Sequence, residues 1–157
     1  QMLYFNKMLG APLPPIEEWK PPPLQPFFPE EAKSRKVKAS ADFMRCGNPY
    51  IISERALSSL AGVFEANGLL YPLTLEGSKQ KYFMFVCHNI VDCLDLGKSK
   101  VKRSVVNPSI ITTVLEPAFR NERLKGQHVF AVPEVPHFLY MTELMKNLVA
   151  DAKLKEL

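Results

Sequence analysis

The sequence predicts an α+β fold with a mainly antiparallel sheet, two principal helices and a proline-rich extended segment at the N-terminus. Short apolar or β-branched runs follow one another without the strand–helix alternation of a parallel, doubly wound sheet. Two stretches with apolar residues at three- and four-residue spacing predict the helices. Eight of the 14 prolines lie within residues 12–29, and proline fixes φ and lacks an N–H, so this piece can be neither helix nor central strand.

The domain organisation follows from this composition. Residues 1–40 form the extended segment, and residues 41–157 form the α+β domain. The segment carries five large apolar side chains, which leaves two alternatives open: it wraps the domain and buries them, or it is a docking strip for a partner. We favour wrapping, because large aromatic side chains gain most from burial. The five residues are Ile16, Trp19, Leu24, Phe27 and Phe28.

The first helix is predicted to begin at Ser53, whose hydroxyl can accept a free N–H of the first turn. A stripe of apolar residues follows, and Asn67–Gly68 predicts the stop, because glycine accepts the left-handed conformation after a helix. The second helix is predicted to begin at Thr142. The stripe of the first helix is Leu57, Leu60, Val63 and Phe64, and that of the second is Leu144, Met145, Leu148, Val149 and Ala152.

Strands are predicted where apolar and β-branched residues cluster between turn signals. Residues 69–75 and 81–89 flank a polar turn and predict a hairpin, with Pro72 marking an edge or a bulge. A short helix is expected at 118–123. The other predicted strands are residues 109–115, 127–132 and 137–141.

Charge and cysteine content exclude several classes. Twenty basic and 16 acidic residues give a formal charge of +4, and the basic runs 33–38 and 98–103 are interpreted as solvated connections, not as a nucleic-acid patch. An odd number of cysteines without a secretory signal predicts a reducing compartment, the cytoplasm. No apolar run has the length that a membrane span needs. Neither nucleic acid nor membrane is therefore expected as a partner.

Two pairs of residues invite a chemical interpretation. Cys87 and His88 are neighbours on a strand, so their side chains point to opposite faces and cannot act together. Asp92 and Asp95 could do acid–base work or bind a metal, but we favour capping of a turn by their carboxylates. His88, His128 and His137 lack the spacing of a zinc site. We therefore predict no catalytic, cofactor-binding or metal-binding residue and no cofactor.

One set of motifs carries a resemblance to a known family. Residues 53–57 open a helix, residues 69–73 and 82–86 follow, and residues 129–133 and 139–143 come before the last helix. The order resembles a bacterial family, formerly a domain of unknown function, that is grouped with immunity proteins of polymorphic-toxin and contact-dependent secretion systems. The most specific piece is an aspartate-x-leucine-aspartate motif with a lysine-serine pair: Asp92, Leu94, Asp95, Lys98 and Ser99.

The resemblance implies a non-catalytic protein that binds one cognate toxin in the cytoplasm and neutralises it. The motif residues are expected to hold the fold, and the toxin-binding residues are unknown. Because inhibitors of basic nucleases are often acidic, the positive charge makes a nuclease target less favoured. A homodimer is left open. Two alternatives remain: an adaptor that binds peptides at an exposed sheet edge, and an enzyme with a cryptic site around His88, Asp92 and Asp95.

Overall fold

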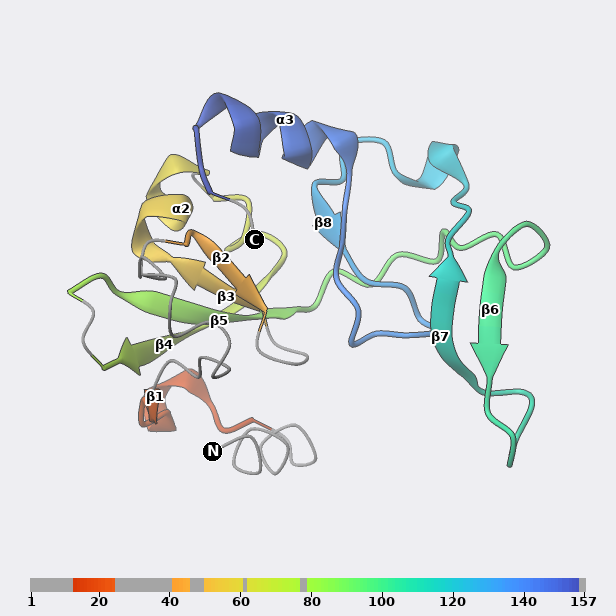
Figure 1. Ribbon diagram of the computed structural model, residues 1–157, viewed down its shortest axis with the longest axis horizontal. Helices are drawn as coiled ribbons and strands as arrows, with labels where there is room; N and C mark the ends of the chain where they lie inside the picture. Colours follow the sequence, from red (N-terminus) through yellow and green to blue (C-terminus); the bar gives the residue numbers. More distant parts are fainter. Residues whose placement is uncertain (1–12, 25–40, 46–49, 61, 77–78, 156–157) are drawn as a thin grey trace, which may run out of the picture.

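The computed structural model describes residues 13–24, 41–45, 50–60, 62–76 and 79–155. It contains two α-helices, α2 (Glu54–Ser59) and α3 (Glu143–Asp151), and sheets whose strands are mainly antiparallel. The predicted α+β class is confirmed. Figure 1 shows two lobes: the five-stranded sheet lies in one and the two-stranded sheet of residues 100–116 in the other, with α3 extending between them at the top of the view. No helix among the described residues is long and apolar enough to cross a membrane.

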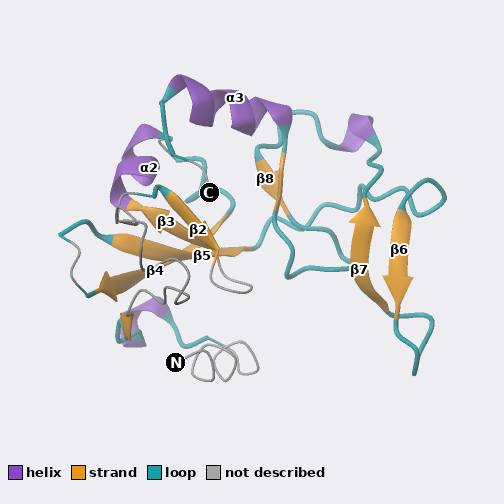
Figure 2. Ribbon diagram, viewed as in Figure 1, coloured by secondary structure: helices purple, strands orange, loops and turns teal. Residues whose placement is uncertain are grey.

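The five-stranded sheet has the order β1-β4-β5-β3-β2. Its four long-range pairings are antiparallel except for that of β1 with β4 (Figure 2). The β4–β5 pair is the predicted hairpin, and both faces of β4 carry packed side chains: Leu70 packs against one core, whereas Tyr71 and Leu73 are buried in another. The strands are β1 (Pro23–Leu24), β2 (Phe43–Arg45), β3 (Tyr50–Ser53), β4 (Gly68–Leu75) and β5 (Tyr82–Cys87).

Helices α2 and α3 cover one face of this sheet and enclose the first core. Phe64 is fully buried, and its ring meets that of Phe85 edge to face with 5.0 Å between centroids. Met145 of α3 is also fully buried in this cluster. Because these residues come from the turn after α2, from β5 and from α3, packing in this core holds both helices on the sheet.

Residues 13–24 lie on the opposite face, where a second core includes Trp19, Tyr71 and Leu73. Trp19, after a short 3-10 helix (Ile16–Glu18), is 9% exposed and donates its indole N–H to the carbonyl of Pro72 at 2.8 Å. Its ring meets that of Tyr71 edge to face. Ile16, by contrast, is 44% exposed. The side chains of Leu24, Phe27 and Phe28, which were also expected to be buried, lie outside the described residues.

Pro72 occupies a position that suits a residue without an N–H. It pairs with Phe83 of β5 on one side, whereas β1 pairs only with Thr74 and Leu75 on the other. Pro72 therefore lies beyond the end of β1, where its carbonyl accepts the Trp19 bond. The strand β4 is an inner strand of the sheet, but at Pro72 its side away from β5 is not paired with β1, so of the predicted edge or bulge the edge position holds at this residue.

The second lobe is built from residues 91–140 around a third core that includes Cys93, Phe130 and Val135. Asn89 connects it to the first lobe: its amide donates to the side chains of Asn67 and Gln127, each at 2.7 Å. The elements of this lobe are β6 (Lys100–Arg103), β7 (Ile111–Glu116), a 3-10 helix (Asn121–Arg123), β8 (Val129–Phe130) and β9 (Tyr140–Met141).

The first helix starts as predicted and ends differently. The Ser53 hydroxyl accepts from the Ala56 N–H at 3.0 Å, which confirms the N-cap. Regular helix ends at Ser59, yet the stripe residues Leu60 and Phe64 still reach the core. Gly68 is not a left-handed cap: it begins β4, and a Cβ there would lie 2.3 Å from the carbonyl oxygen of Val86. The need for glycine comes from this close approach of β5.

Three other sequence predictions need correction. Thr142 does cap α3, and Met145 and Val149 are buried, but Leu144 is 48% exposed and lies outside the packed stripe. Residues 98–103, interpreted as a solvated connection, include strand β6. Its exposed side chains gave no apolar alternation to recognise. The strands expected at 127–132 and 137–141 shorten to the two-residue β8 and β9, because most of their backbone follows turns instead of a ladder.

Candidate functional site

The motif residues of the sequence gather in one loop of the second lobe. Asp95 accepts the N–H of Gly97 on its carboxylate at 3.1 Å, and its own carbonyl accepts the N–H of Ser99 at 2.8 Å. Lys98 lies 3.5 Å from the same carboxylate. This is a turn capped by an aspartate, as such a side chain favours. The arrangement supports a structural role for Asp95, which stays a prediction.

The rest of the motif fastens this loop to the segment after β7. The Ser99 hydroxyl donates to the carbonyl of Ala118 at 3.2 Å and accepts the N–H of the same residue at 2.9 Å. Leu94 is 3% exposed and forms an isolated bridge with Phe119. The loop and residues 118–119 are thus held together by both polar and apolar contacts.

Asp92 is placed differently from the prediction. Its carboxylate accepts a hydrogen bond from the guanidinium of Arg120 at 2.7 Å. No backbone N–H of a described residue donates to this carboxylate, so it does not cap the turn. The Asp92 side chain is 67% exposed, so this ion pair contributes little. Asp92 and Asp95 therefore have separate partners, and the chain does not bring them together as a carboxylate pair.

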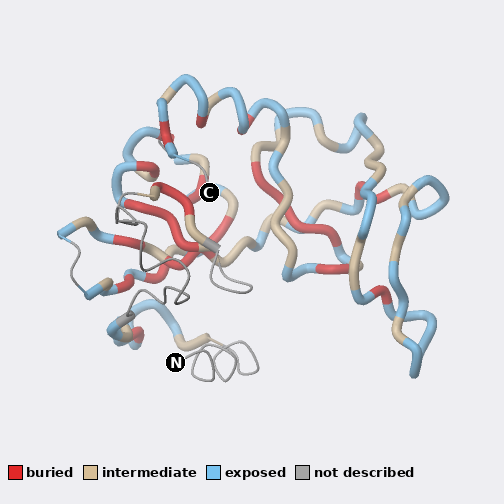
Figure 3. The backbone as a smooth tube through the Cα atoms, in the orientation of Figure 1, coloured by how far each residue is buried: buried red, intermediate tan, exposed pale blue. Residues whose placement is uncertain are grey.

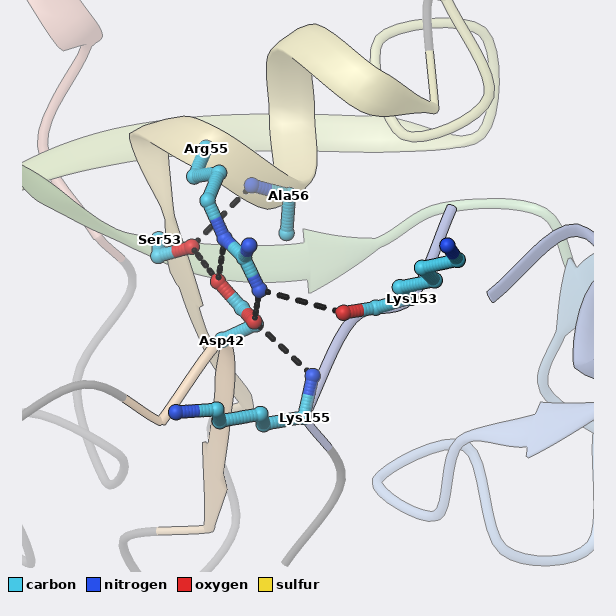
Figure 4. A network of polar contacts seen from close by, with 6 residues as sticks. All are labelled: Asp42, Ser53, Arg55, Ala56, Lys153 and Lys155. Carbon is cyan, nitrogen blue, oxygen red and sulfur yellow. Dashed lines mark hydrogen bonds and ion pairs between the residues drawn. The ribbon is translucent and has the colours of Figure 1, made fainter. Parts of the chain in front are cut away.

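A second polar cluster was not found from the sequence. Asp42, just before β2, is 1% exposed and lies between α2 and the C-terminal residues (Figure 4). Its carboxylate accepts from the Ser53 hydroxyl at 2.8 Å, from Nε of Arg55 at 3.0 Å and from the Lys155 N–H at 2.8 Å. A second guanidinium nitrogen of Arg55 donates to the other carboxylate oxygen and, at 3.4 Å, to the carbonyl of Lys153.

The electrostatics of this cluster follow from its donors. Hydrogen bonds from Arg55, opposed by burial and assisted by the Lys155 N–H and the Ser53 hydroxyl, lower the pKa of Asp42 from 3.8 to about 2. Asp42 in turn raises the pKa of Arg55. Four donors of the same chain occupy the two oxygens of the Asp42 carboxylate, so no lone pair is left to act on a substrate. The cluster therefore joins the end of the chain to the sheet and to α2.

Strand β5 ends at Cys87, so His88, predicted to continue the strand, lies just after it. Cys87 packs against the first core, whereas His88 is exposed. Burial raises the pKa of the Cys87 thiol and of the Cys93 thiol, which disfavours the reactive thiolate. Among the residues that the structure describes, no group of three or more His, Cys, Asp or Glu side chains could hold a metal ion.

The comparisons with known proteins decide the family. The model described as Immunity protein family (Imm11) matches residues 7–157. The chain belongs to this immunity protein family. The match begins within the extended N-terminal segment, and thus includes Trp19 as well as the motif around Asp95. No curated protein matches the chain.

In this Imm11 member, the motif loop around Asp95 was identified from the sequence, whereas the polar cluster around Asp42 was not. Asp42 is 11 and 13 residues from Ser53 and Arg55 and 113 residues from Lys155, so no local spacing announces it. The available signal was the N-cap of α2. Ser53 caps the helix and Arg55 occupies its second position, so both side chains can donate to the same carboxylate, which is that of Asp42. The sequence analysis noted the basic run at residues 98–103 but assigned it to a connection, so strand β6 was missed.

Proposed function

We propose that this protein binds a cognate bacterial toxin in the cytoplasm and neutralises it by occupancy, without catalysis. The observation that carries the proposal is the family match over residues 7–157. The toxin is expected to be encoded beside this chain, and a specific complex of this kind buries on the order of 1,600 Å².

The geometry of the polar residues is consistent with a binding protein. Asp95 and Ser99 use their polar atoms on the backbone of their own loop, and Asp42 uses its atoms on Ser53, Arg55 and Lys155. The alternative enzyme hypothesis requires His88, Asp92 and Asp95 to meet in one site. Asp95 bonds to its own loop and Asp92 to Arg120, and no contact joins the three described residues. The proposal therefore places recognition on the outer surface and not in these clusters.

An adaptor that binds peptides by strand addition is the second candidate. The sheet of β6 and β7 has two strands only, so each has an edge that pairs with no other described strand. The pairing of β6 with β7 is irregular at two places, where Leu115 and Thr112 of β7 are extra residues with no partner in the register. Because such bulges protect an edge from strand addition, β7 is poorly suited to bind a peptide in this way.

The test is capture of the tagged protein from its native host under conditions of active antagonistic secretion, followed by mass spectrometry. One dominant partner with a toxin-like C-terminal domain is expected, and co-expression of that domain with the protein should restore growth. Many unrelated extended peptides would instead support the adaptor. Failure to bind the neighbouring toxin domain, produced in pure form, would refute the proposed function.

A further inference from the structure

The β6–β7 hairpin, residues 98–116, projects from the second lobe on the side away from the five-stranded sheet (Figure 1). Most of its length is exposed, as the pale tube in Figure 3 shows. Ile111 is its one buried residue, at 8% exposure, and anchors β7 in the third core. The hairpin is therefore attached at one side and offers its other surfaces to a partner.

The tip of the hairpin, residues 104–110, displays two adjacent valines to solvent. Val105 is 96% and Val106 is 95% exposed, and Ile110, in the same loop, is 53% exposed. Isolated exposed apolar residues are ordinary, but two consecutive, almost fully exposed β-branched side chains at an outermost point form an apolar patch that marks an interaction site. They contribute almost nothing to the packing of this chain.

The tip holds these valines in a defined backbone. The Ser104 N–H donates to the carbonyl of Ile110 at 2.9 Å, and the Ser109 N–H donates to the side chain of Asn107 at 3.1 Å. Arg103 donates to the carbonyl of Pro108 at 3.0 Å. A loop that is already ordered loses less conformational freedom on binding, which improves affinity.

The hairpin also carries most of the net charge of the chain. It contains four exposed basic residues, Lys98, Lys100, Lys102 and Arg103, and one acidic residue, Glu116. Three of the four net positive charges of the chain therefore lie here, and the rest of the sequence is nearly balanced. Lys98 pairs with Asp95 at 3.5 Å and Lys100 with Glu116 at 3.0 Å, whereas Lys102 and Arg103, nearest the tip, form no ion pair with a described residue.

We propose that the tip of the β6–β7 hairpin docks on the toxin, with Val105 and Val106 entering an apolar hollow that acidic residues of the toxin surround. This inference rests on the proposed function and adds the surface that performs it. An apolar centre with a charged rim is the usual anatomy of a specific interface. Opposite charges on the rim speed association and set the orientation of the partners.

The experiment uses the full chain and the purified toxin domain encoded beside it, and measures the dissociation constant by titration calorimetry. Two hairpin variants are compared with wild type: the double variant Val105→Ser/Val106→Ser, and Lys102→Glu. Their matched controls lie in the other lobe: Leu69→Ser, where leucine is 48% exposed, and Lys20→Glu, where lysine is exposed. Thermal melting of each variant checks that it is folded.

The proposal predicts that both hairpin variants weaken binding by about tenfold or more, as truncation of central anchors does, while both controls bind as wild type does. For Lys102→Glu, most of the loss should be in the association rate and should diminish with added salt. Melting temperatures should agree within about 2 °C, because every replaced residue is exposed to solvent and lies outside the cores.

Three results would overturn the docking surface. Wild-type binding by both hairpin variants refutes it while leaving the toxin-binding function intact. Conversion of a dimer to a monomer by the hairpin variants, with toxin binding unchanged, would assign the tip to a second copy of this chain. Loss of binding to a 20-base-pair DNA duplex alone would assign it to nucleic acid. If the wild-type chain itself does not bind the toxin domain, the proposed function fails, and the docking surface with it.

Discussion

Replacing Asp42 by asparagine tests the polar cluster that joins the C-terminal residues to the sheet. The carboxylate receives only donors, from Ser53, Arg55 and Lys155, so an amide nitrogen in its place would face a donor and lose at least one bond. The substitution also removes the charge that Arg55 binds. We expect the free energy of unfolding to fall, because a buried acceptor site is left mismatched.

The magnitude follows from the pKa of Asp42. A fall from 3.8 to about 2 corresponds to about 2.5 kcal/mol, since one unit of pKa is worth about 1.4 kcal/mol. Half of the Arg55 side chain is exposed, at 51%, and solvent screens part of this interaction. We therefore expect Asp42→Asn to destabilise the chain by about 2 kcal/mol at pH 7, which lowers the melting temperature by roughly 4–8 °C for a protein of this size.

The sign of the pH dependence is fixed by the same value. A carboxyl group with a lowered pKa in the folded state stabilises the protein above its unfolded pKa of about 4, and this contribution is lost as the pH falls towards about 2. The difference between wild type and Asp42→Asn should thus be constant from pH 6 to 8 and should narrow between about pH 5 and 2.

Urea unfolding followed by far-UV circular dichroism, at several pH values, measures these differences. The control is Asp151→Asn, at the exposed end of α3, where we expect a change within about 0.5 kcal/mol. Two results would refute the reasoning: an Asp42→Asn variant as stable as wild type at pH 7, or a deficit that does not shrink in acid.

Three further predictions concern packing and reactivity. Gly68→Ala should destabilise the chain by about 3 kcal/mol, because its Cβ would lie 2.3 Å from the Val86 carbonyl oxygen, whereas Gly97→Ala, 3.4 Å from a carboxylate oxygen of Asp95, should cost less than about 1 kcal/mol; equal effects in urea unfolding would contradict the close approach of β4 and β5. Ser99→Ala should lower the free energy of unfolding by about 1 kcal/mol, because two hydrogen bonds to Ala118 are lost. An unchanged melting temperature would contradict a structural role of the motif loop. In a Cys46→Ser background, Cys93 should resist thiol reagents at pH 8, because its side chain is fully buried and burial raises its pKa; rapid labelling of the folded protein would show that this core opens.

Sequence patterns predicted those parts of the fold that depend on local or periodic signals. The caps of Ser53 and Thr142 were found because a hydroxyl three residues before a free N–H is a local feature. The β4–β5 hairpin was found because apolar residues flank a polar turn. The family resemblance, carried by the motif around Asp95, is confirmed by the match to the family model.

The remaining features depend on contacts between distant residues. Gly68 was assigned to a helix stop, and only the approach of β5, from residues 85 and 86, shows why glycine is needed there. Strand β6 was missed because both of its faces are largely solvated, which removes the alternation that marks a strand. The role of Asp42 depends on Lys155, 113 residues away, and no pattern in the sequence joins the two.

The most direct test of the account is the growth of cells that express the neighbouring toxin domain, with and without this protein. Full protection by wild type and by the Leu69→Ser control, together with weak protection by Val105→Ser/Val106→Ser at equal protein levels, is the result that we predict. Cells that die at the same rate whether or not wild-type protein is present would contradict the claim that this chain neutralises that toxin.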